Sequence, residues 1–597
     1  MVSKTGIGGA VRALVAGFGL TLPLAAPALA QSQEPSVRGS MAAHYDRQTS
    51  AVSALPEVLS EYERSFYTDL FAAIDAEEWD EVEEQLSEQP TGLLHQIARA
   101  EFYTHASSPR ISAQLIASWF DDGVHLPQSQ QLGRMGERRG LSAVPRLPSA
   151  QGFSRQAEDQ RRVRPRSIDD GSISEREKRA ILDFIREDDP ASAFGVLSNI
   201  DPDLSPEARA EWRQRVAWSF YIENDDASAL ELARTVSEGA GAWVAEGEWV
   251  AGLASWRLGD CSLAGASFAR AASAATNVEL ASAAHYWAHR ASIRCRLPAL
   301  AQQHLALAAR YDETLYGMLA KDQLGMNLPQ GEVQQAFTQR DWTTLSDRPN
   351  VRIAVALVEI DRLELADEVL RHEVRIGRAE DYEALGRLAQ MLGLPSTQLF
   401  MGHYTPYGAR PNRALRFPVA SWRPVNGWRV DPALAFAHAL QESSFRTSAV
   451  SSANARGLMQ ITPITVREHA PRLNLSASYV DLNDPEVNLT FGQRNLEMLR
   501  DSAVTQGRLP KIMAAYNAGL TPVERWNTEI RDMGDPLLWM ESIPYWETRS
   551  YVAIVMRNYW MYERAAGVPS PSRRALAQGQ WPAFPQMSGS DRASLTR

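Results

Sequence analysis

Cysteine is almost absent from this sequence. Only Cys261 and Cys295 occur among its 597 residues, and neither belongs to a metal-ligand spacing or to a thiol-catalysis motif. The scarcity argues against a cysteine-based catalytic or zinc site. Two alternatives stay open for the pair: a structural disulfide, as an oxidising compartment allows, or two buried thiols. The sequence does not show whether the two side chains meet within bonding distance.

A surplus of basic charge is also missing. The formal net charge is −11 at pH 7, which argues against nucleic-acid binding because that function needs clustered basic surface. No His, Cys and Asp cluster has metal-ligand spacing and no glycine-rich loop has phosphate-binding form, so we expect no metal and no cofactor. The composition, 44% hydrophobic and 22% charged, is typical of a soluble globular protein. A chain of this length divides into several units.

Long hydrophobic runs are confined to the N-terminus. Lys4 and Arg12 precede an apolar run over 13–24, and Ala28-Leu29-Ala30 follows it. This order predicts a secretory signal peptide, residues 1–30, cleaved after Ala30. The alternative is an anchoring helix, but the run is interrupted by Gly and Pro and is shorter than the ~20 residues that span a bilayer. No Cys follows the cleavage site, so we expect no lipid anchor and a protein that is not embedded in the membrane.

Helical periodicity dominates the residues that follow. Apolar residues recur every three or four positions from Leu59 to Phe120, and again from Glu175 to about Leu392. The segments around Trp249 and Tyr286 look like two copies of a helix-hairpin repeat. Repeated helix pairs bury their apolar faces by stacking, so we expect an α-helical superhelix within residues 31–405. We interpret its Trp and Tyr residues as inter-helix packing rather than as a sugar platform.

Three segments break the helical pattern. Residues 127–170 are rich in Arg, Gly, Pro and Ser and predict a loop, either a solvated linker or a contact for an anionic peptide or a partner. Residues 406–424 contain repeated Pro, Gly and Arg and mark a domain boundary. The tail, residues 569–597, has no periodicity and is expected to be disordered.

The most informative segment begins after this boundary. Asp431-Pro432 is a strong helix start, because Asp accepts hydrogen bonds from first-turn amides and Pro at the first position loses none. Steps of four from Leu434 lead to His438 and Glu442 on one face. Glu442 then lies in the last turn of a buried helix, where desolvation raises a carboxyl pKa toward the value that a general acid needs. The alternative is a solvated carboxylate at a helix end.

Four sequence blocks occur in order around this carboxylate. They are Gln441-Glu442-Ser443-Ser444-Phe445 with the later run Gly457-Leu458-Met459-Gln460, then Asn488 with Gly492, then Ala514-Ala515-Tyr516-Asn517-Ala518-Gly519, and then Glu541 to Val552. Together they resemble the catalytic signature of the soluble lytic transglycosylases. The resemblance implies a mainly α protein, with an N-terminal superhelix followed by a lysozyme-like α+β catalytic domain at residues 420–568.

The sequence departs from the family pattern at a few positions. Asn454 stands where Gly is usual, Thr447 where Pro is common, Asn495 where an aromatic residue is usual and Leu520 where Pro commonly follows. Asn tolerates the left-handed backbone better than most residues, so the change at 454 is mild. Asn495 puts one aromatic packing contact in doubt.

The resemblance also implies a reaction. Members of the family cleave the MurNAc-GlcNAc β-1,4 bond of peptidoglycan and form 1,6-anhydromuramic acid, and Glu442 would act first as acid and then as base. The signature supplies no Asp close in sequence to Glu442, whereas most glycosidases use two carboxylates. The alternatives are a hydrolytic muramidase of the same fold, which needs a second carboxylate facing Glu442, and a helical-repeat scaffold that binds glycan without cutting it.

The remaining site residues follow from matching positions in the family. The candidate substrate-binding residues are Ser451, Met459, Gln460, Tyr516, Asn517, Glu547 and Tyr551. Glu547 has the alternative of a structural ion pair with Arg549 or another Arg, and His438 is interpreted as a core histidine. Gly457 and Gly519 are expected to serve backbone geometry at tight approaches. The expected partner is the peptidoglycan glycan strand and the expected location is the periplasm, with further partners in cell-wall synthesis or division left open.

Overall fold

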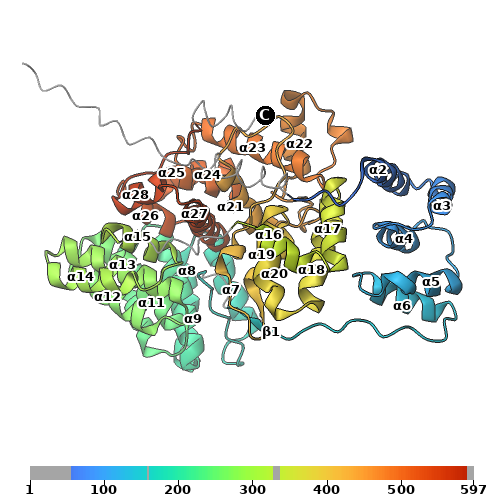
Figure 1. Cartoon of the computed structure of the whole chain (residues 1–597). Helices are drawn as coiled ribbons and strands as arrows, with labels where there is room; N and C mark the ends of the chain where they lie inside the picture. The colour runs from blue at the N-terminus through green and yellow to red at the C-terminus, as the bar shows by residue number, and fades with distance from the viewer. Residues whose placement is uncertain (1–54, 157–160, 327–335, 588–597) are drawn as a thin grey trace, which may run out of the picture. The chain divides into compact units, whose positions relative to one another are not determined.

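The computed structural model describes residues 55–156, 161–326 and 336–587 (Figure 1). Within these ranges the protein is mainly α-helical, as predicted, and its one two-stranded sheet pairs β1 with β2. The first helices are α2 (Glu61–Asp75), α3 (Trp79–Glu88), α4 (His95–Thr104), α5 (Ala113–Gly123), α6 (Ser129–Arg138), α7 (Glu175–Arg186), α8 (Pro190–Ile200), α9 (Pro206–Ile222), α10 (Asp226–Arg234), α11 (Trp243–Leu258), α12 (Cys261–Ala274), α13 (Val278–Arg294), α14 (Pro298–Ala308) and α15 (Leu315–Gln323).

The later elements include the helices that carry the catalytic signature. They are α16 (Gln339–Leu345), α17 (Pro349–Glu359), α18 (Leu363–Ile376), α19 (Tyr382–Met391), α20 (Pro395–His403), α21 (Pro432–Ser443), α22 (Pro463–His469), α23 (Pro485–Asp501), α24 (Leu509–Ala518), α25 (Leu520–Glu529), α26 (Pro536–Glu541), α27 (Trp546–Ala566) and α28 (Pro571–Ala577). The strands are β1 (Phe153–Arg155) and β2 (Tyr404–Pro406), paired antiparallel. The described strand-like pairing within residues 420–587 consists of isolated bridges, two in residues 450–461 and one between Arg508 and Ala583.

The helices start at residues that cap them. The Ser174 hydroxyl oxygen accepts a hydrogen bond from the backbone amide of Glu177, and the Glu177 carboxylate accepts one from the backbone amide of Ser174, which forms a capping box for α7. Asp431 accepts from the backbone amide of Ala433 at 2.9 Å, and Pro432 is the first residue of α21. The helix start predicted at Asp431-Pro432 is therefore confirmed.

Large aromatic residues fill the contacts between successive helices of α7–α15, which we call the arm helices. Trp249 on α11 is 2% exposed, and its ring lies 5.2 Å from Phe268 on α12 and 6.3 Å from Trp287 on α13. Each buried aromatic side chain removes a large apolar area from water. These two Trp side chains are packing residues rather than a sugar platform, as predicted.

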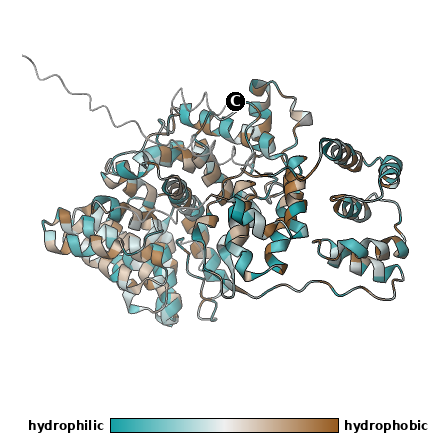
Figure 2. Ribbon diagram, viewed as in Figure 1, coloured by the Kyte–Doolittle hydropathy of each residue, from teal (hydrophilic) through white to brown (hydrophobic). Residues whose placement is uncertain are grey.

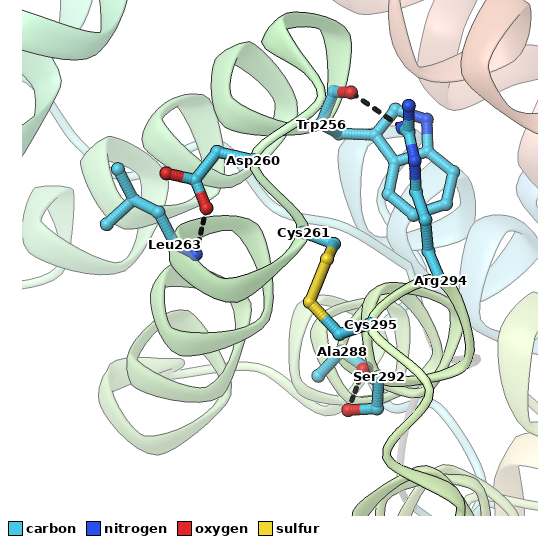
Figure 3. The surroundings of a disulfide bond; sticks show 8 residues. All are labelled: Trp256, Asp260, Cys261, Leu263, Ala288, Ser292, Arg294 and Cys295. Carbon is cyan, nitrogen blue, oxygen red and sulfur yellow. Dashed lines mark hydrogen bonds between the residues drawn. A yellow bond between two sulfur atoms is a disulfide. The ribbon is translucent and has the colours of Figure 1, made fainter.

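A disulfide joins Cys261, the first residue of α12, to Cys295, which directly follows α13 (Figure 3). The bond decides between the two alternatives that the sequence left open. Beside it, Arg294 donates a hydrogen bond to the carbonyl oxygen of Trp256 at 2.9 Å. Through both contacts the end of α13 is tied to the turn between α11 and α12.

Hydrophobic and hydrophilic residues mix within individual helices (Figure 2). None of the helices in the described ranges is both long and apolar enough to cross a lipid bilayer. The predicted signal peptide, residues 1–30, lies outside the described residues. The amphipathic pattern matches helices that bury one face and expose the other.

Two large hydrophobic cores hold the described residues together. One core draws on residues 59–132 and 345–415, and the other on residues 173–320 and 399–584. The described part of residues 31–405, expected to form the superhelical unit, therefore contributes to both cores. The arm helices α7–α15 share their core with the helices of the catalytic signature.

The segment 127–170 is not uniformly a loop. It contains α6 and strand β1, and β1 pairs with β2 more than 240 residues later, with Phe153 opposite Pro406. The side chain of Arg162 is 11% exposed and pairs with Glu246 and Glu541. The interpretation as a solvated linker is wrong for this part of the segment, because its partners are supplied by distant helices that local composition does not reveal.

The tail is ordered as far as the structure describes it. Residues 571–577 form α28, the backbone amide of Leu509 donates to the carbonyl oxygen of Pro582 at 2.8 Å, and Phe584 is 4% exposed. The prediction of disorder is wrong for residues 569–587, and residues 588–597 lie outside the described ranges. The two aromatic residues Trp581 and Phe584 bury apolar surface that offsets the chain's entropy cost.

Candidate active site

Helix α21 places Glu442 at the entrance of a tight left-handed turn. The helix ends at Ser443, and the next two residues, Ser444 and Phe445, have positive φ values of 52° and 61°. Left-handed backbone is costly for residues with a side chain, so packing must hold it in place. Phe445 is 1% exposed and its ring lies 5.8 Å from Phe436. This buried anchor fixes the turn and thereby the last helical turn that carries Glu442.

The Glu442 carboxyl group is largely desolvated and has one direct hydrogen-bond partner among the described residues. The hydroxyl group of Tyr551 on α27 donates to its Oε1 atom at 2.6 Å. Burial raises the pKa of Glu442 to about 7, the Tyr551 hydrogen bond opposes that shift, and the negative charge of Glu547 adds to it. A carboxyl group with this pKa is substantially protonated at neutral pH and can donate a proton.

Tyr516 and His438 lie beside this carboxyl group. The hydroxyl group of Tyr516 donates to the carbonyl oxygen of Met459 at 2.8 Å, and the Tyr516 ring lies 4.7 Å from that of His438. His438 is fully buried and its Nδ1 lies 2.9 Å from the carbonyl oxygen of Leu434, which makes Nδ1 the protonated nitrogen. Burial lowers the pKa of His438 to about 4. His438 is a neutral core residue, as interpreted from sequence.

Asn488 organises the loop that follows α21. Its side-chain oxygen accepts from the backbone amide of Met459 at 2.8 Å, and its nitrogen donates to the carbonyl oxygens of Arg456 and Leu482, both at 2.8 Å. A buried amide with three bonds to backbone groups fixes loop geometry. Sequence reasoning counted Asn488 as a motif residue and assigned it no role.

Gly457 is required by this arrangement. Its φ is 74°, and a Cβ atom there would lie 2.1 Å from the side-chain nitrogen of Asn488 and 2.2 Å from the carbonyl oxygen of Leu482. Gly519 also has a positive φ, 88°, but open space surrounds its missing Cβ. Asn454 adopts the left-handed backbone expected of it, with a φ of 58°. Gly457 therefore lies at a tight approach, as predicted. At Gly519 only the positive φ favours glycine, so the expected tight approach is wrong there.

Ser451 and Gln460 bond to their own loop. The Ser451 hydroxyl oxygen accepts from the backbone amides of Ala453 and Ala455, at 3.2 and 3.1 Å. The Gln460 side-chain nitrogen donates to the carbonyl oxygens of Ala449 and Gly457, at 3.2 and 3.0 Å. Both side chains therefore brace the loop, and their contact with substrate stays a prediction.

The first turn of α27 borders the site from the opposite side. The side-chain oxygen of Asn517 accepts from the hydroxyl group of Thr548 at 2.6 Å, and Glu547 is exposed. The anticipated Glu547–Arg549 ion pair is not formed among the described residues. Arg549 instead donates to the carbonyl oxygen of Ile543 at 3.1 Å and lies against the rings of Trp218 and Trp546.

The positions that depart from the family pattern have partners of their own. Thr447 donates a hydrogen bond to Glu364 on α18, which links the loop after Glu442 to the helices before the catalytic region. Asn495 lies within hydrogen-bond distance of His469, at 3.4 Å. Leu520 is the first residue of α25. The aromatic contact in doubt at 495 is thus replaced by a polar one.

Comparison with known proteins places this geometry in a family. Residues 423–535 match the family model described as the transglycosylase SLT domain. The matched range contains Glu442, Ser451, Met459, Gln460, Tyr516 and Asn517 and ends before Glu547 and Tyr551. The chain carries an SLT domain, and its resemblance to the soluble lytic transglycosylase family is confirmed over this part.

Two relatives are named soluble lytic murein transglycosylase. The protein of Escherichia coli K12 is 33% identical over 147 residues, which cover 24% of this chain and 22% of that protein. The protein of Salmonella typhimurium is 32% identical over 159 residues, which cover 26% of this chain and 24% of that protein. The alignments thus span about a quarter of either length.

Two solved structures are similar over most of the chain at low identity. The 70 kDa soluble lytic transglycosylase of Escherichia coli is 16% identical with a TM-score of 0.49, covering 89% of this chain and 99% of that one. The lytic transglycosylase Slt of Pseudomonas aeruginosa is 18% identical with a TM-score of 0.48, covering 89% and 92%.

Proposed function

We propose that this protein is a peptidoglycan lytic transglycosylase that cleaves the MurNAc-GlcNAc β-1,4 bond and leaves 1,6-anhydromuramic acid. The observation that carries the proposal is the Glu442 carboxyl group, whose pKa burial raises to about 7 and whose Oε1 accepts from Tyr551. A general acid needs a pKa near the operating pH. The SLT domain around it supports the same reaction class.

In the proposed mechanism Glu442 acts twice. It first protonates the glycosidic oxygen while the substrate's own N-acetyl group assists departure. The resulting carboxylate, held by the Tyr551 hydroxyl group, then takes the proton of the sugar's C6 hydroxyl group as that oxygen closes the anhydro ring. Attack within one molecule gains from proximity and needs no ordered water.

The other residues have proposed supporting roles. Ser451 and Gln460 lie on the loop that Asn488 and Gly457 hold in place, and Tyr516 secures Met459 through its carbonyl oxygen. Asn517 and Thr548 connect the end of α24 to the first turn of α27. We propose that this loop and these two helix ends contact the sugar rings on either side of the scissile bond.

The proposed organisation follows the sequence boundaries. Residues 1–30 would direct the chain to the periplasm, residues 31–405 would form the helical arm, and residues 420–568 would perform the chemistry on glycan strands. The buried bridge from Arg162 to Glu246 on α11 and Glu541 on α26 supports a catalytic region that rests on the arm. If residues 420–568 were detached from the arm, Glu541 would lose its ion pair with Arg162 and its hydrogen bond from the Tyr316 hydroxyl group.

A hydrolytic muramidase is the second candidate, and one observation favours it. Glu547 is a second carboxylate close enough to Glu442 to raise its pKa. Hydrolysis with two carboxylates would use Glu547 to orient or activate a water molecule. Glu547→Gln would then abolish turnover. In a lytic transglycosylase, where Glu547 would only contact the substrate, the variant would keep measurable turnover.

Mass analysis of products from purified cell-wall sacculi tests the proposal. Lytic cleavage releases fragments lighter by one water than hydrolytic ones, and reducing-end muramic acid alone would contradict it. Glu442→Gln keeps the shape of the side chain but removes the proton donor, so turnover falls on the order of 10² to 10⁴-fold. A folded Glu442→Gln protein with near-normal turnover would show that another residue is the acid. An inactive Glu442→Gln protein that binds glycan as tightly as the parent would show that Glu442 acts in the reaction and not in substrate binding.

A further inference from the structure

Helix α27 is tied to both ends of α21 by tyrosine hydroxyl groups. At the end of α21, Tyr551 donates to Glu442 at 2.6 Å. At its start, Tyr559 donates to Oδ2 of Asp431 at 3.0 Å. The two tyrosines lie about 12 Å apart along α27. A shift at either tie would move the whole of α21, because a packed helix behaves as a rigid element.

Tyr559 is shared between two carboxyl groups. Besides bonding Asp431, its hydroxyl group makes a hydrogen bond with the side chain of Glu563, which lies one helical turn later on α27. The Ser570 hydroxyl group donates to Oε2 of Glu563. Tyr559 and Glu563 are each 3% exposed and Ser570 is 4% exposed. The cluster is therefore closed off from bulk water, and its groups must satisfy one another.

The cluster holds too few protons for two ionised carboxylates. A tyrosine hydroxyl group has one proton, and Tyr559 donates it to Asp431. The bond between Tyr559 and Glu563 then needs a proton from Glu563, because an ionised carboxylate can only accept. Two carboxylates around this hydroxyl group would compete for its single proton and repel each other. The geometry thus requires one neutral carboxyl group.

Glu563 is the carboxyl group that keeps the proton. Asp431 is partly exposed, accepts from a first-turn backbone amide at 2.9 Å and lies at the N-terminus of α21, where the helix dipole favours a negative charge. Burial raises the pKa of Glu563 to about 8, and the negative charge of Asp431 adds to the rise. The hydrogen bonds with Ser570 and Tyr559 and the charge of Arg573 on α28 oppose it.

We propose that Tyr559 and a protonated Glu563 position the start of α21 and, through this helix, the Glu442 carboxyl group. The neutral Glu563 donates to the Tyr559 hydroxyl group, which in turn donates to Asp431. Both are positioning residues, because they are buried and reach Glu442 only through α21. The proposal rests on the proposed function, since it adds a pH-dependent control to the acid of that reaction.

Loss of the Glu563 proton would loosen this chain of hydrogen bonds. Above about pH 8 Glu563 becomes a second carboxylate, which competes with Asp431 for the Tyr559 proton and repels Asp431. The tie between α27 and the start of α21 is then weakened. A misplacement of about 1 Å at reacting groups can cost ~10²-fold in rate. Turnover should therefore fall at alkaline pH for a second reason, beyond the ionisation of Glu442 itself.

Turnover of glycan by the full-length protein tests the positioning role. Tyr559→Phe should lower kcat roughly tenfold and leave KM near the parent value, because it moves the acid without touching bound substrate. Tyr562→Phe is the matched control, since it removes from the same helix a buried hydroxyl group that donates to the carbonyl oxygen of Pro418 at 2.9 Å. The control should keep kcat near the parent value. Equal kcat values in the two variants, both folded by circular dichroism, would overturn the role of Tyr559.

The pH dependence of kcat tests the proton on Glu563. Glu563→Gln keeps a neutral donor for Tyr559 and cannot ionise. Its kcat should therefore match that of the parent at about pH 6 and exceed it roughly tenfold at about pH 9.5. This comparison stays decisive even if Tyr559→Phe fails to fold. A ratio of the two kcat values that stays constant over this range would overturn the proposal.

A measurement without turnover separates this proposal from the proposed function. In the Glu442→Gln background, adding Glu563→Gln should raise the unfolding free energy by an amount that grows between about pH 4.5 and 8. The sign follows because the unfolded chain releases the Glu563 proton at lower pH than the native state does. A difference that does not change with pH would overturn the protonation of Glu563. Product masses that indicate hydrolysis would overturn only the proposed function.

Discussion

The hydroxyl group of Tyr551 donates to Oε1 of Glu442 at 2.6 Å, joining the second turn of α27 to the end of α21 across 109 residues of sequence. This bond lowers the pKa of Glu442, while burial raises it more strongly to about 7. The balance leaves a carboxyl group that can both give and take a proton near neutral pH. Tyr551 therefore adjusts the acid as well as positioning it.

Tyr551→Phe should move the alkaline limb of the pH profile to higher pH. Removing the hydroxyl group removes a contact that favours the charged carboxylate, so the pKa of Glu442 rises. The limb in kcat/KM reports the pKa of the free enzyme's acid. Tyr516→Phe is the control, since its hydroxyl group bonds Met459 instead. A limb that moves to lower pH in Tyr551→Phe would contradict this assignment.

Glu442→Gln should stabilise the fold at neutral and alkaline pH. The pKa of Glu442 is raised from 4.5 to about 7 on folding, so the unfolded chain loses its proton first and the native state is penalised as pH rises through this window. The variant's gain in unfolding free energy over the parent should therefore be absent below about pH 4.5 and grow between pH 4.5 and 7. Above pH 7 it should level off at up to about 3 kcal/mol.

Urea unfolding at several pH values measures this difference. Gln441→Ala, a change at the exposed neighbouring position on α21, alters no ionisable group, so its effect should not change with pH. A constant difference between Glu442→Gln and the parent from pH 4 to pH 8 would show that Glu442 does not titrate in this window.

Gly457→Ala should destabilise the protein more than Gly519→Ala. Both positions have positive φ, so each substitution costs roughly 1–3 kcal/mol of backbone strain. At Gly457 the new Cβ would also collide with Asn488 and the carbonyl oxygen of Leu482, whereas at Gly519 it meets nothing. Unfolding free energies of the two variants provide the comparison. Equal losses of unfolding free energy would mean that Asn488 moves aside freely. Turnover of Gly457→Ala would then show whether the position of Asn488 matters for the loop after α21.

Trp581→Ala should lower the unfolding free energy by about 1–3 kcal/mol, whereas the same substitution in a disordered tail would leave it unchanged. Its ring lies 5.8 Å from Trp539, and the cations of Arg508 and Lys511 lie 4.7 and 5.0 Å from it. The loss combines apolar area with cation–π attraction. Gln580→Ala, a change at an exposed neighbour, should stay within about 0.5 kcal/mol. Indistinguishable melting curves for the two variants would refute this role of the tail.

Local signals were sufficient to predict the helices, and α21 in particular. The start of α21 at Asp431-Pro432 and the position of Glu442 in its last turn depend on caps and periodicity within a few residues. The positive φ at Asn454 and Gly457 also follows from the intrinsic preferences of Asn and Gly. The roles of the site residues toward substrate stay predictions.

Contacts between distant residues depended on the tertiary structure. Composition could not show that Arg162 reaches Glu541 or that Trp581 packs on Trp539, nor which of the two states Cys261 and Cys295 adopt. The sequence by itself determined the helices, their caps and the family signature, because these depend on neighbours within a few positions. Burial, ion pairs and shifted pKa values depend on which surfaces meet after folding, so only the tertiary structure decided them.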